Sequence, residues 1–264
     1  MFKKKRTAII LCGGRGSRLG VLSKKIPKTL VRVQKKEILW FIINILKKNN
    51  FNHIILPVGY KGEKIKKFIK KNFKQNKNIE IFNTGLDSSI ASRIFKIKKH
   101  IKSEDFLLLN GDAIFNFDLE KIYKNHKKKK IKMTFISFSF QADFGTISIK
   151  DKKIIGFQRN FVFNNVEAKN KDNLKAYVYS GISLMNKSLL VKNFKLYKNF
   201  EKELYPQIVK KFKCSVKIPK GFFTSIDNIK DIYKVNAKNV KDSKYLEVKK
   251  IKELIISSNN KNDR

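Results

Sequence analysis

The chain is poor in cysteine, histidine and acidic residues. Its two cysteines, Cys12 and Cys214, lie far apart and form no C-x-x-C pair, and its three histidines are isolated. This pattern excludes a disulfide framework and the closely spaced ligands of a zinc site. Its longest apolar run is too short to cross a bilayer, and the apolar stretch near the N-terminus is too short for a secretory signal. We therefore expect a reduced, cytoplasmic protein that does not enter a membrane.

Acidic residues are strongly outnumbered. The 264 residues include 61 Lys+Arg and 21 Asp+Glu, which gives a formal net charge of +40. Such a balance alone suggests a polyanionic partner. The lysines, however, are scattered through every segment, often beside Asn and Ile, instead of forming one patch. We therefore expect no nucleic-acid partner, although the basic field would attract nucleotides and phosphate esters.

Strand and helix patterns alternate over the first half of the chain. The expected strands are Ala8–Leu11, His53–Val58, Ile79–Phe82 and Asp105–Asn110. The expected helices between them are Glu37–Asn49, Gly62–Asn72 and Ser89–Lys99. This order predicts a three-layer, Rossmann-like α/β fold, in which a mostly parallel sheet is flanked by helices.

The pattern changes after about Ile131. Strands are expected at Lys132–Phe140, Thr146–Ile149, Lys153–Phe157, Ala176–Met185, Cys214–Ile218 and Phe222–Ile226. Short turns separate the second and third of these strands, so we expect a small antiparallel subregion that covers the substrate side. Further helices are expected at Lys187–Phe194, Phe200–Lys211 and Asn228–Asn239, followed by a C-terminal helix and polar tail over 241–264.

A glycine-rich segment follows the first strand. Gly13, Gly14 and Gly16 let the backbone turn tightly and bring N–H groups near a ligand, and Arg15 and Arg18 add fixed positive charge. The segment lacks the G-x-x-x-x-G-K-[ST] string of a P-loop and the third glycine of a dinucleotide fingerprint. It fits a polyphosphate site, and the alternative is a surface loop without a ligand.

Two aspartates follow expected strands. Asp112 comes after the strand Asp105–Asn110 and a glycine, and Asp227 comes directly after Phe222–Ile226. A carboxylate at such a strand end suits Mg²⁺, which takes one or two carboxylates together with phosphate oxygens. The alternatives are a turn or cap role for Asp112 and capping of the following helix for Asp227. Two aspartates, a loop of amides and a lysine together form the set that metal-dependent nucleotidyl transfer requires.

The segment Leu11–Leu19, followed by Pro27-Lys28, resembles the signature of the sugar-1-phosphate nucleotidylyltransferases, in which G-G-x-G-[ST]-R-L precedes P-K-P. The similarity extends to about Asn236, and within the family the chain is most similar to glucose-1-phosphate cytidylyltransferases. Asp227 lies six residues after Gly221, which is the spacing of the cytidylyltransferases. The resemblance implies the nucleotide-diphospho-sugar transferase fold in a single domain over 1–240, with a nucleotide-binding half (1–130) and a sugar-binding half (131–240).

The resemblance also implies the partners and the role of individual residues. The partners would be a nucleoside triphosphate, with CTP favoured, and a sugar 1-phosphate, and a homo-oligomer is left open. Arg18 and Lys28 would be catalytic, and Asp112 and Asp227 would bind the cofactor Mg²⁺. The nucleotide would be bound by Leu11, Gly13, Gly14, Arg15, Gly16, Ser17, Thr84, Gly85, Arg93 and Gly111. The sugar phosphate would be bound by Gly145, Arg159, Tyr179, Ser180 and Gly181.

Two segments depart from the family pattern. Where the family has E-K-P, this chain has Gln158-Arg159-Asn160, and a T-G-G-R-like run has become Ile90-Ala91-Ser92-Arg93. A planar guanidinium is not equivalent to an ammonium group at a phosphate. Three alternatives therefore stand beside the first hypothesis. They are a guanylyltransferase acting on heptose 1-phosphate, a cytidylyltransferase acting on a non-sugar phosphate ester, and a non-catalytic homologue that binds sugar nucleotides.

Overall fold

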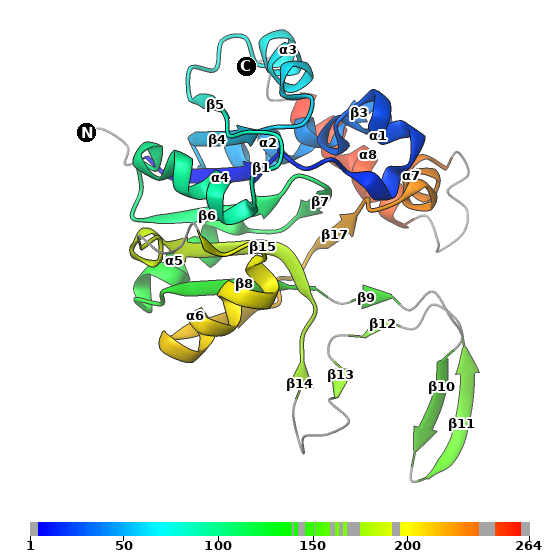
Figure 1. Ribbon diagram of the computed structural model, residues 1–264. Coiled ribbons are helices and arrows are strands. Elements are labelled where there is room, and N and C mark those ends of the chain that lie inside the picture. The colour runs from blue at the N-terminus through cyan, green and yellow to red at the C-terminus, as the bar shows by residue number, and fades with distance from the viewer. Residues whose placement is uncertain are drawn as a thin grey trace.

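The computed structural model describes residues 5–138, 140–141, 146–150, 152–158, 162–163, 166–167, 175–191, 196–237 and 246–259. A seven-stranded sheet runs through its centre in the order β16-β8-β15-β6-β1-β4-β5 (Figure 1). In that order the strands are Cys214–Lys217, Met133–Ser137, Tyr179–Asn186, Asp105–Asn110, Thr7–Leu11, His53–Val58 and Ile79–Asn83. Every pairing is parallel except the two made by β15. The predicted mostly parallel α/β fold is confirmed.

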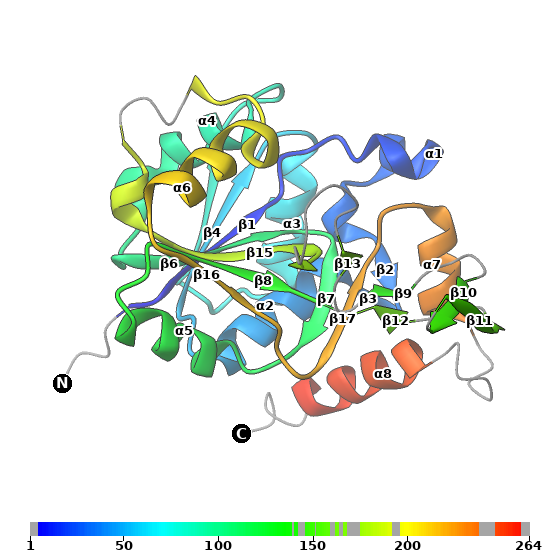
Figure 2. The same cartoon turned by 90° about the horizontal axis from the view of Figure 1, so that it is seen from below.

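Both faces of the sheet are covered by helices, as Figure 2 shows. Side chains alternate along β1, so Ala8 and Ile10 pack on one face and Ile9 packs on the other. The first face carries α2 (Ile38–Lys48), α3 (Gly62–Asn72), α5 (Leu119–Lys128) and α8 (Leu246–Asn259). The second face carries α4 (Ile90–Ile97) and α6 (Tyr205–Lys211). The other α-helices within the described residues are α1 (Val21–Lys25) and α7 (Ile229–Asn236).

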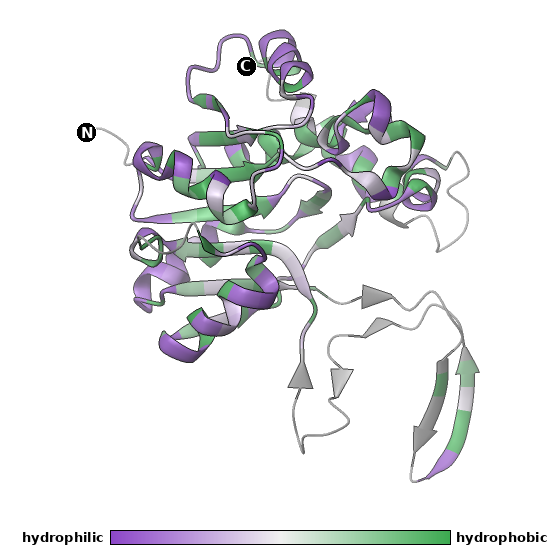
Figure 3. Ribbon diagram, viewed as in Figure 1, coloured by the Kyte–Doolittle hydropathy of each residue, from purple (hydrophilic) through white to green (hydrophobic). Residues whose placement is uncertain are grey.

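Helix α2 is the most deeply buried of these helices. Its residues from Ile38 to Leu46 are buried except Asn44, because α2 lies between the sheet and the outer helices. Apolar residues all round a helix are typical of this position. Figure 3 shows the corresponding pattern, with hydrophobic strands at the centre and hydrophilic outer helices. No helix in the described ranges is both long and apolar enough to cross a membrane.

The second half contains the expected small antiparallel sheets together with one parallel pair in the main sheet. The expected strands Lys132–Phe140 and Cys214–Ile218 belong largely to the main sheet, where β8 and β16 pair in parallel. The antiparallel part consists of β15 in the main sheet, the hairpin of β10 (Thr146–Lys150) and β11 (Lys153–Gln158), and short two-stranded sheets. Those short pairs are β9 (Phe140–Gln141) with β12 (Val162–Phe163) and β13 (Val166–Glu167) with β14 (Lys175–Ala176). In the first half, β2 (Arg32–Val33) and β3 (Lys36–Glu37) form another short antiparallel pair.

The helix expected over Lys187–Phe194 is wrong for the residues described there. Only Lys187–Leu189 form a single 3₁₀ turn, capped by the side chain of Asn186. The expected helix over Phe200–Lys211 is present and begins with a π-helical turn, Phe200–Leu204, before α6.

A further short sheet pairs β7 (Ala113–Asn116) with β17 (Phe222–Ser225). Sequence patterns did not predict β7, which follows β6 almost directly. The antiparallel register joins Ala113 to Ser225, so the residues just before β7 and just after β17 meet. This pairing brings the second half of the chain to the carboxyl end of β6.

Candidate active site

The site forms where β1 and β6 end side by side. Leu11 pairs with Asn110, so the glycine segment after β1 and Gly111 after β6 leave the sheet together. A Cβ at Gly111 would lie 2.7 Å from the Leu11 carbonyl oxygen and 2.4 Å from Cγ2 of Thr29. Only glycine fits such a close approach of two segments of the backbone.

The glycine segment turns sharply before its arginine. Gly16 has a φ of +63° and begins the 3₁₀ turn Ser17–Leu19, whose last side chain is fully buried. This buried leucine anchors the turn, while Arg18 remains largely exposed at its surface. Among the described residues, the backbone N–H groups of Gly14 and Arg15 find no acceptor. These donors remain available to an anionic ligand.

Lys28 bridges the two aspartates. Its Nζ donates to Oδ2 of Asp112 at 2.8 Å and to Oδ1 of Asp227 at 2.9 Å. The two carboxylate oxygens therefore cannot lie farther apart than the sum of these two distances. Arg18 adds a second cation, with Nη2 at 3.1 Å from the same Asp227 oxygen. Four residues from three distant segments thus form one charged cluster.

The pairing of β7 and β17 explains how the aspartates meet. The N–H of Ile226 donates to the carbonyl of Asp112 at 2.9 Å, one residue before Asp227. The cap of α7 is Asn228, which forms a capping box with Asp231. The alternative role of Asp227 as the helix cap is therefore not the one observed. No helix follows Asp112 either, because β7 begins at the next residue.

Charge on Asp227 is stabilised by its neighbours. Partial burial acts to raise the pKa of this carboxyl, but the hydrogen bond and charge of Lys28, assisted by Arg18, outweigh it. The net result is a pKa below the ordinary aspartate value, so the carboxylate stays ionised at neutral pH.

The two carboxylates fit a divalent cation whose other ligands are water and phosphate oxygens. Two carboxylates already converge on one cationic nitrogen, which acts as a stand-in for a metal ion. The described ranges contain no group of three or more metal-ligating side chains. Mg²⁺ commonly binds through one or two carboxylates and completes its shell with water and substrate phosphates. Asp112 and Asp227 are therefore the residues that could hold it.

A cavity of about 400 Å³ opens beside this cluster. It is lined by Leu11, Cys12, Gly13, Gly14, Gly16, Ser17, Arg18, Lys28, Thr29, Ser88, Ile90, Arg93, Asn110, Gly111, Asp112 and Asp227. Most residues predicted to bind the nucleotide and metal are thus brought together. Cys12 is buried as expected, and burial raises the pKa of its thiol far above the ordinary range, which makes it unreactive.

Arg93 ties the walls of this cavity together. Its Nη1 donates to Thr84 Oγ1 and to the Gly85 carbonyl, both at 2.8 Å. Its Nη2 donates to the carbonyls of Gly13 at 3.1 Å and Leu86 at 3.0 Å. The buried guanidinium therefore links the glycine segment to the loop after β5. Burial lowers its pKa, with the nearby Asp87 charge opposing that effect.

Three residues predicted to bind the nucleotide do not line the cavity. Arg15 instead pairs with Asp87 at 2.9 Å on the surface. Thr84 is buried, and its hydroxyl donates to the carbonyl of Val58. Gly85 contributes its carbonyl to Arg93, so Thr84 and Gly85 lie behind the wall that Arg93 organises.

A second cavity of about 260 Å³ adjoins the first and shares Leu11, Ile90 and Asn110 with it. Its further lining residues are Leu108, Tyr179, Gly181, Lys198, Asn199, Phe200, Glu201 and Tyr205. Among the predicted sugar-binding residues, Tyr179 and Gly181 are therefore at this cavity. Ser180 is not, because its hydroxyl donates to the Ile136 carbonyl. Gly145 and Arg159 lie outside the described residues.

Sequence reasoning did not identify several of these lining residues. Ser88 lies between the expected strand Ile79–Phe82 and the expected helix Ser89–Lys99, and Asn110 ends an expected strand, but neither carries a motif of its own. Ile90 begins the altered T-G-G-R-like run but was not itself assigned to the site. Asn199 caps the π-helical turn and Glu201 belongs to it, and no sequence pattern indicated this turn. Such turns are frequently found at functional sites, but single-sequence periodicity does not reveal them.

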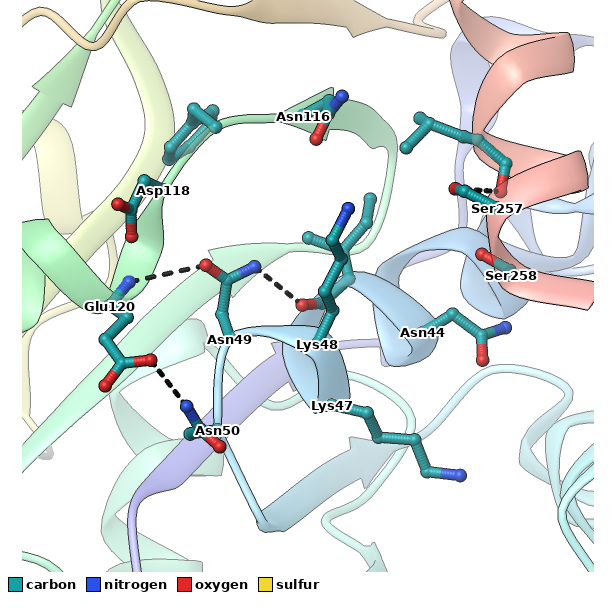
Figure 4. A pocket seen from close by; sticks show the side chains of 13 residues that line it. Asn44, Lys47, Lys48, Asn49, Asn50, Asn116, Asp118, Glu120, Ser257 and Ser258 are labelled. Carbon is teal, nitrogen blue, oxygen red and sulfur yellow. Dashed lines mark hydrogen bonds between the residues drawn. The ribbon is translucent and has the colours of Figure 1, made fainter. Parts of the chain in front are cut away.

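A third cavity, of about 620 Å³, lies between the ends of α2, α5 and α8 (Figure 4). It shares no lining residue with the other two. Its polar groups serve neighbouring backbone. Asn49 donates to the Ile45 carbonyl and accepts from the N–H groups of Leu119 and Glu120, and Ser257 donates to the Leu254 carbonyl. The bonds of Leu119 and Glu120 to Asn49 join α5 to the end of α2, and the other two stabilise the ends of α2 and α8, so these polar groups are occupied by backbone and do not converge on the cavity.

Comparisons with known proteins agree with this geometry. The model of the family described as nucleotidyl transferase matches residues 7–239. The probable glucose-1-phosphate cytidylyltransferase of Bacillus subtilis is 30% identical over 252 residues, covering 87% of this chain and 94% of the relative. The D-glycero-alpha-D-manno-heptose 1-phosphate guanylyltransferase of Campylobacter jejuni is 30% identical over 230 residues, covering 86% and 96%.

A solved structure shares the fold. HddC from Yersinia pseudotuberculosis superimposes with a TM-score of 0.64 at 20% identity, covering 87% of this chain and 97% of HddC. HddC complexed with GMP-PN superimposes with a TM-score of 0.62.

Proposed function

The chain belongs to the nucleotidyl transferase family, and on that premise we propose that it transfers a nucleotidyl group from a nucleoside triphosphate to a sugar 1-phosphate. CTP is the favoured donor, and the products are a nucleoside diphosphate sugar and pyrophosphate. A phosphate oxygen of the sugar phosphate attacks the α-phosphorus, and the bond to the β-phosphate bridging oxygen breaks. The electron pair of that bond leaves with pyrophosphate.

The proposal depends above all on one observation, the convergence of Lys28, Asp112 and Asp227 in the lining of the glycine-rich cavity. Free backbone N–H groups and Arg18 would bind the triphosphate, and Lys28 would stabilise charge on the reacting phosphates. Asp112 and Asp227 would hold Mg²⁺, which when bound supplies charge neutralisation at the phosphate oxygens. The ribose and base would lie along the wall formed by Ser88, Ile90 and Arg93.

The adjoining cavity suits the acceptor. Tyr179, Phe200 and Tyr205 provide aromatic surface, and Asn199 and Glu201 provide hydrogen-bonding groups at its edge. Burial raises the pKa of both tyrosines, so their hydroxyls stay protonated. A polyhydroxylated ring needs apolar surface together with polar groups, and this lining supplies both.

Donor preference has two candidates. The six-residue spacing from Gly221 to Asp227 supports CTP. A guanylyltransferase acting on heptose 1-phosphate is the second candidate, because a relative of that name matches at the same 30% identity as the cytidylyltransferase.

The proposal is tested by pyrophosphate release from every pairing of CTP, GTP, UTP and dTTP with glucose 1-phosphate, heptose 1-phosphate and a non-sugar phosphate ester. We expect the highest kcat/KM for CTP with a sugar 1-phosphate. Preference for GTP with heptose 1-phosphate would support the second candidate. Thermal stabilisation by nucleotide without any turnover would instead support a non-catalytic homologue.

A further inference from the structure

We infer that Lys28 and Arg18 are exchangeable counter-ions, which neutralise Asp112 and Asp227 in the unliganded protein and transfer to the triphosphate when a divalent cation replaces them. The inference rests on the proposed function for its two ligands, a metal ion and a polyphosphate. It adds that the binding of the two ligands is coupled. The metal ion frees Lys28 and Arg18 for the polyphosphate, and the polyphosphate draws these two cations away from the carboxylates that the metal ion needs.

The two aspartates need a cation beside them at all times. Their oxygens approach the same Lys28 nitrogen at 2.8 and 2.9 Å, so without a cation the two carboxylates would repel each other at close range. The Lys28 side chain is only 13% exposed, so water provides little of this neutralisation. The ammonium group therefore occupies the position between the acids that a metal ion requires.

Both cations, Lys28 and Arg18, can leave the aspartates. The lysine ammonium sits on a flexible four-carbon stem with three rotatable donors, so it can change partners without backbone movement. Pro27 precedes it, and Thr29 after it is buried, so the backbone stays fixed while the side chain turns. Arg18 is 73% exposed, and its exposed ion pair with Asp227 is weak enough to break readily.

Phosphate groups bound in the cavity would lie close to both cations. Lys28, Arg18 and Gly14, whose N–H group is unpaired, line the same cavity. A Cβ at Gly16 would lie 3.2 Å from Cβ of Lys28, so the glycine backbone runs directly beside the lysine. Phosphates bound on that segment would lie within reach of both cations and would replace the carboxylates as their partners.

Cooperative binding follows from this arrangement. A metal ion must displace Lys28, and the displaced ammonium group is stabilised by a phosphate. The same coupling free energy must then appear whichever ligand binds first. The unliganded protein should accordingly bind a free divalent cation weakly, because its own lysine competes for the site.

The test measures Mn²⁺ binding to the full chain without nucleotide, from the paramagnetic resonance signal of free Mn²⁺. We expect Lys28→Gln to bind Mn²⁺ about fivefold or more tightly than the wild type. Lys25→Gln removes one charge from an exposed neighbouring lysine and is the matched control, with affinity expected to stay within about twofold. The double variant Lys28→Gln, Asp227→Asn should lose the increase in Mn²⁺ affinity. Equal or weaker Mn²⁺ binding by Lys28→Gln would overturn the inference.

A second measurement uses only the wild type and so does not depend on how the variants fold. The rate at which acetic anhydride labels each lysine is followed by mass spectrometry, with and without Mg²⁺. We expect labelling of Lys28 to rise about fivefold or more with Mg²⁺, while that of Lys25 stays constant. An unchanged Lys28 rate would contradict the exchange. Both measurements are independent of turnover, so failure of the proposed reaction and failure of this inference are distinguishable.

Discussion

The N–H of Ile226 donates a hydrogen bond to the carbonyl of Asp112 at 2.9 Å, and this contact sets the geometry of the charged cluster. It extends the β7–β17 ladder by one step beyond the pair of Ala113 and Ser225. Asp227, the next residue, is thereby held beside Asp112, with Lys28 between the two carboxylates. The backbone pairing of two short strands thus positions the acids, while the lysine neutralises them.

Gly111 is predicted to be required for the fold of the site. A Cβ there would meet the Leu11 carbonyl at 2.7 Å, and backbone cannot move aside as a flexible side chain can. We expect Gly111→Ala to destabilise the protein by about 1–3 kcal/mol. The control is Gly14→Ala, where a Cβ meets nothing within 4 Å. Urea unfolding measures both, and equal stability of the two variants would contradict the close approach.

Arg93 is predicted to stabilise the walls of the cavity. Arg93→Met leaves the carbonyls of Gly85 and Leu86 without their donor and removes one of the two donors to the Gly13 carbonyl, which keeps the N–H of Tyr60. We expect a loss of about 2–3 kcal/mol. Arg15→Met is the matched control, because Arg15 makes an exposed ion pair worth less than about 1 kcal/mol. Chemical unfolding curves provide the comparison. If Arg93→Met proved as stable as Arg15→Met, the clamp role would be wrong.

Glu201 is predicted to contact the acceptor sugar. It lines the smaller cavity, so Glu201→Gln should raise the KM for the sugar 1-phosphate about tenfold while leaving the KM for the nucleotide nearly unchanged. Lys202→Gln alters the next residue, which does not line that cavity, and serves as the control. Steady-state kinetics with each substrate varied in turn distinguish the two. An equal rise in both KM values would place the effect outside the acceptor pocket.

Stability is predicted to fall in mildly acidic solution because of His53. This histidine is fully buried, and burial lowers its pKa below the ordinary value of 6.5, although its hydrogen bond to Glu80 opposes the shift. The unfolded chain therefore gains a proton at higher pH than the folded chain does. The free energy of unfolding should decrease as pH falls below 6.5, towards the lower pKa of the folded state.

Urea unfolding between about pH 7.5 and 5.5 measures this dependence. His53→Gln should remove most of the slope in that window, because the carboxyl groups with lowered pKa titrate at more acidic values. If the free energy of unfolding changed equally steeply with pH in His53→Gln and in the wild type, the pH dependence would come from another titrating group.

Much of the fold could be predicted because the sheet strands are short, apolar and separated by amphipathic helices. The pattern around Ile9 and around Leu107 predicts strands buried on both faces, and those strands are central. His53 begins the expected strand His53–Val58 and is fully buried in β4, where Thr7 and Glu80 bond its two ring nitrogens. A polar residue in a strand gives no local sign of such partners.

The candidate site was predictable to the extent that its residues follow strands or belong to the glycine segment. Sequence could not show that Arg93 turns toward backbone carbonyls, because the acceptors come from three separate segments: the end of β4, the loop after β5 and the glycine segment after β1. It could not show that Arg15 turns outward either, since that depends on the position of Asp87. The strand β7, only four residues long, was missed because its pairing with β17 is a long-range contact.

The central claim is that the cluster of Lys28, Asp112 and Asp227 carries out nucleotidyl transfer to a sugar phosphate. Phosphorus NMR of a mixture of CTP, glucose 1-phosphate and Mg²⁺ tests it most directly, with wild type and Asp227→Asn compared. The account predicts equimolar CDP-sugar and pyrophosphate with the wild type, formed at a rate about a hundredfold or more lower with a folded Asp227→Asn. Undiminished formation of both products by Asp227→Asn would contradict the account.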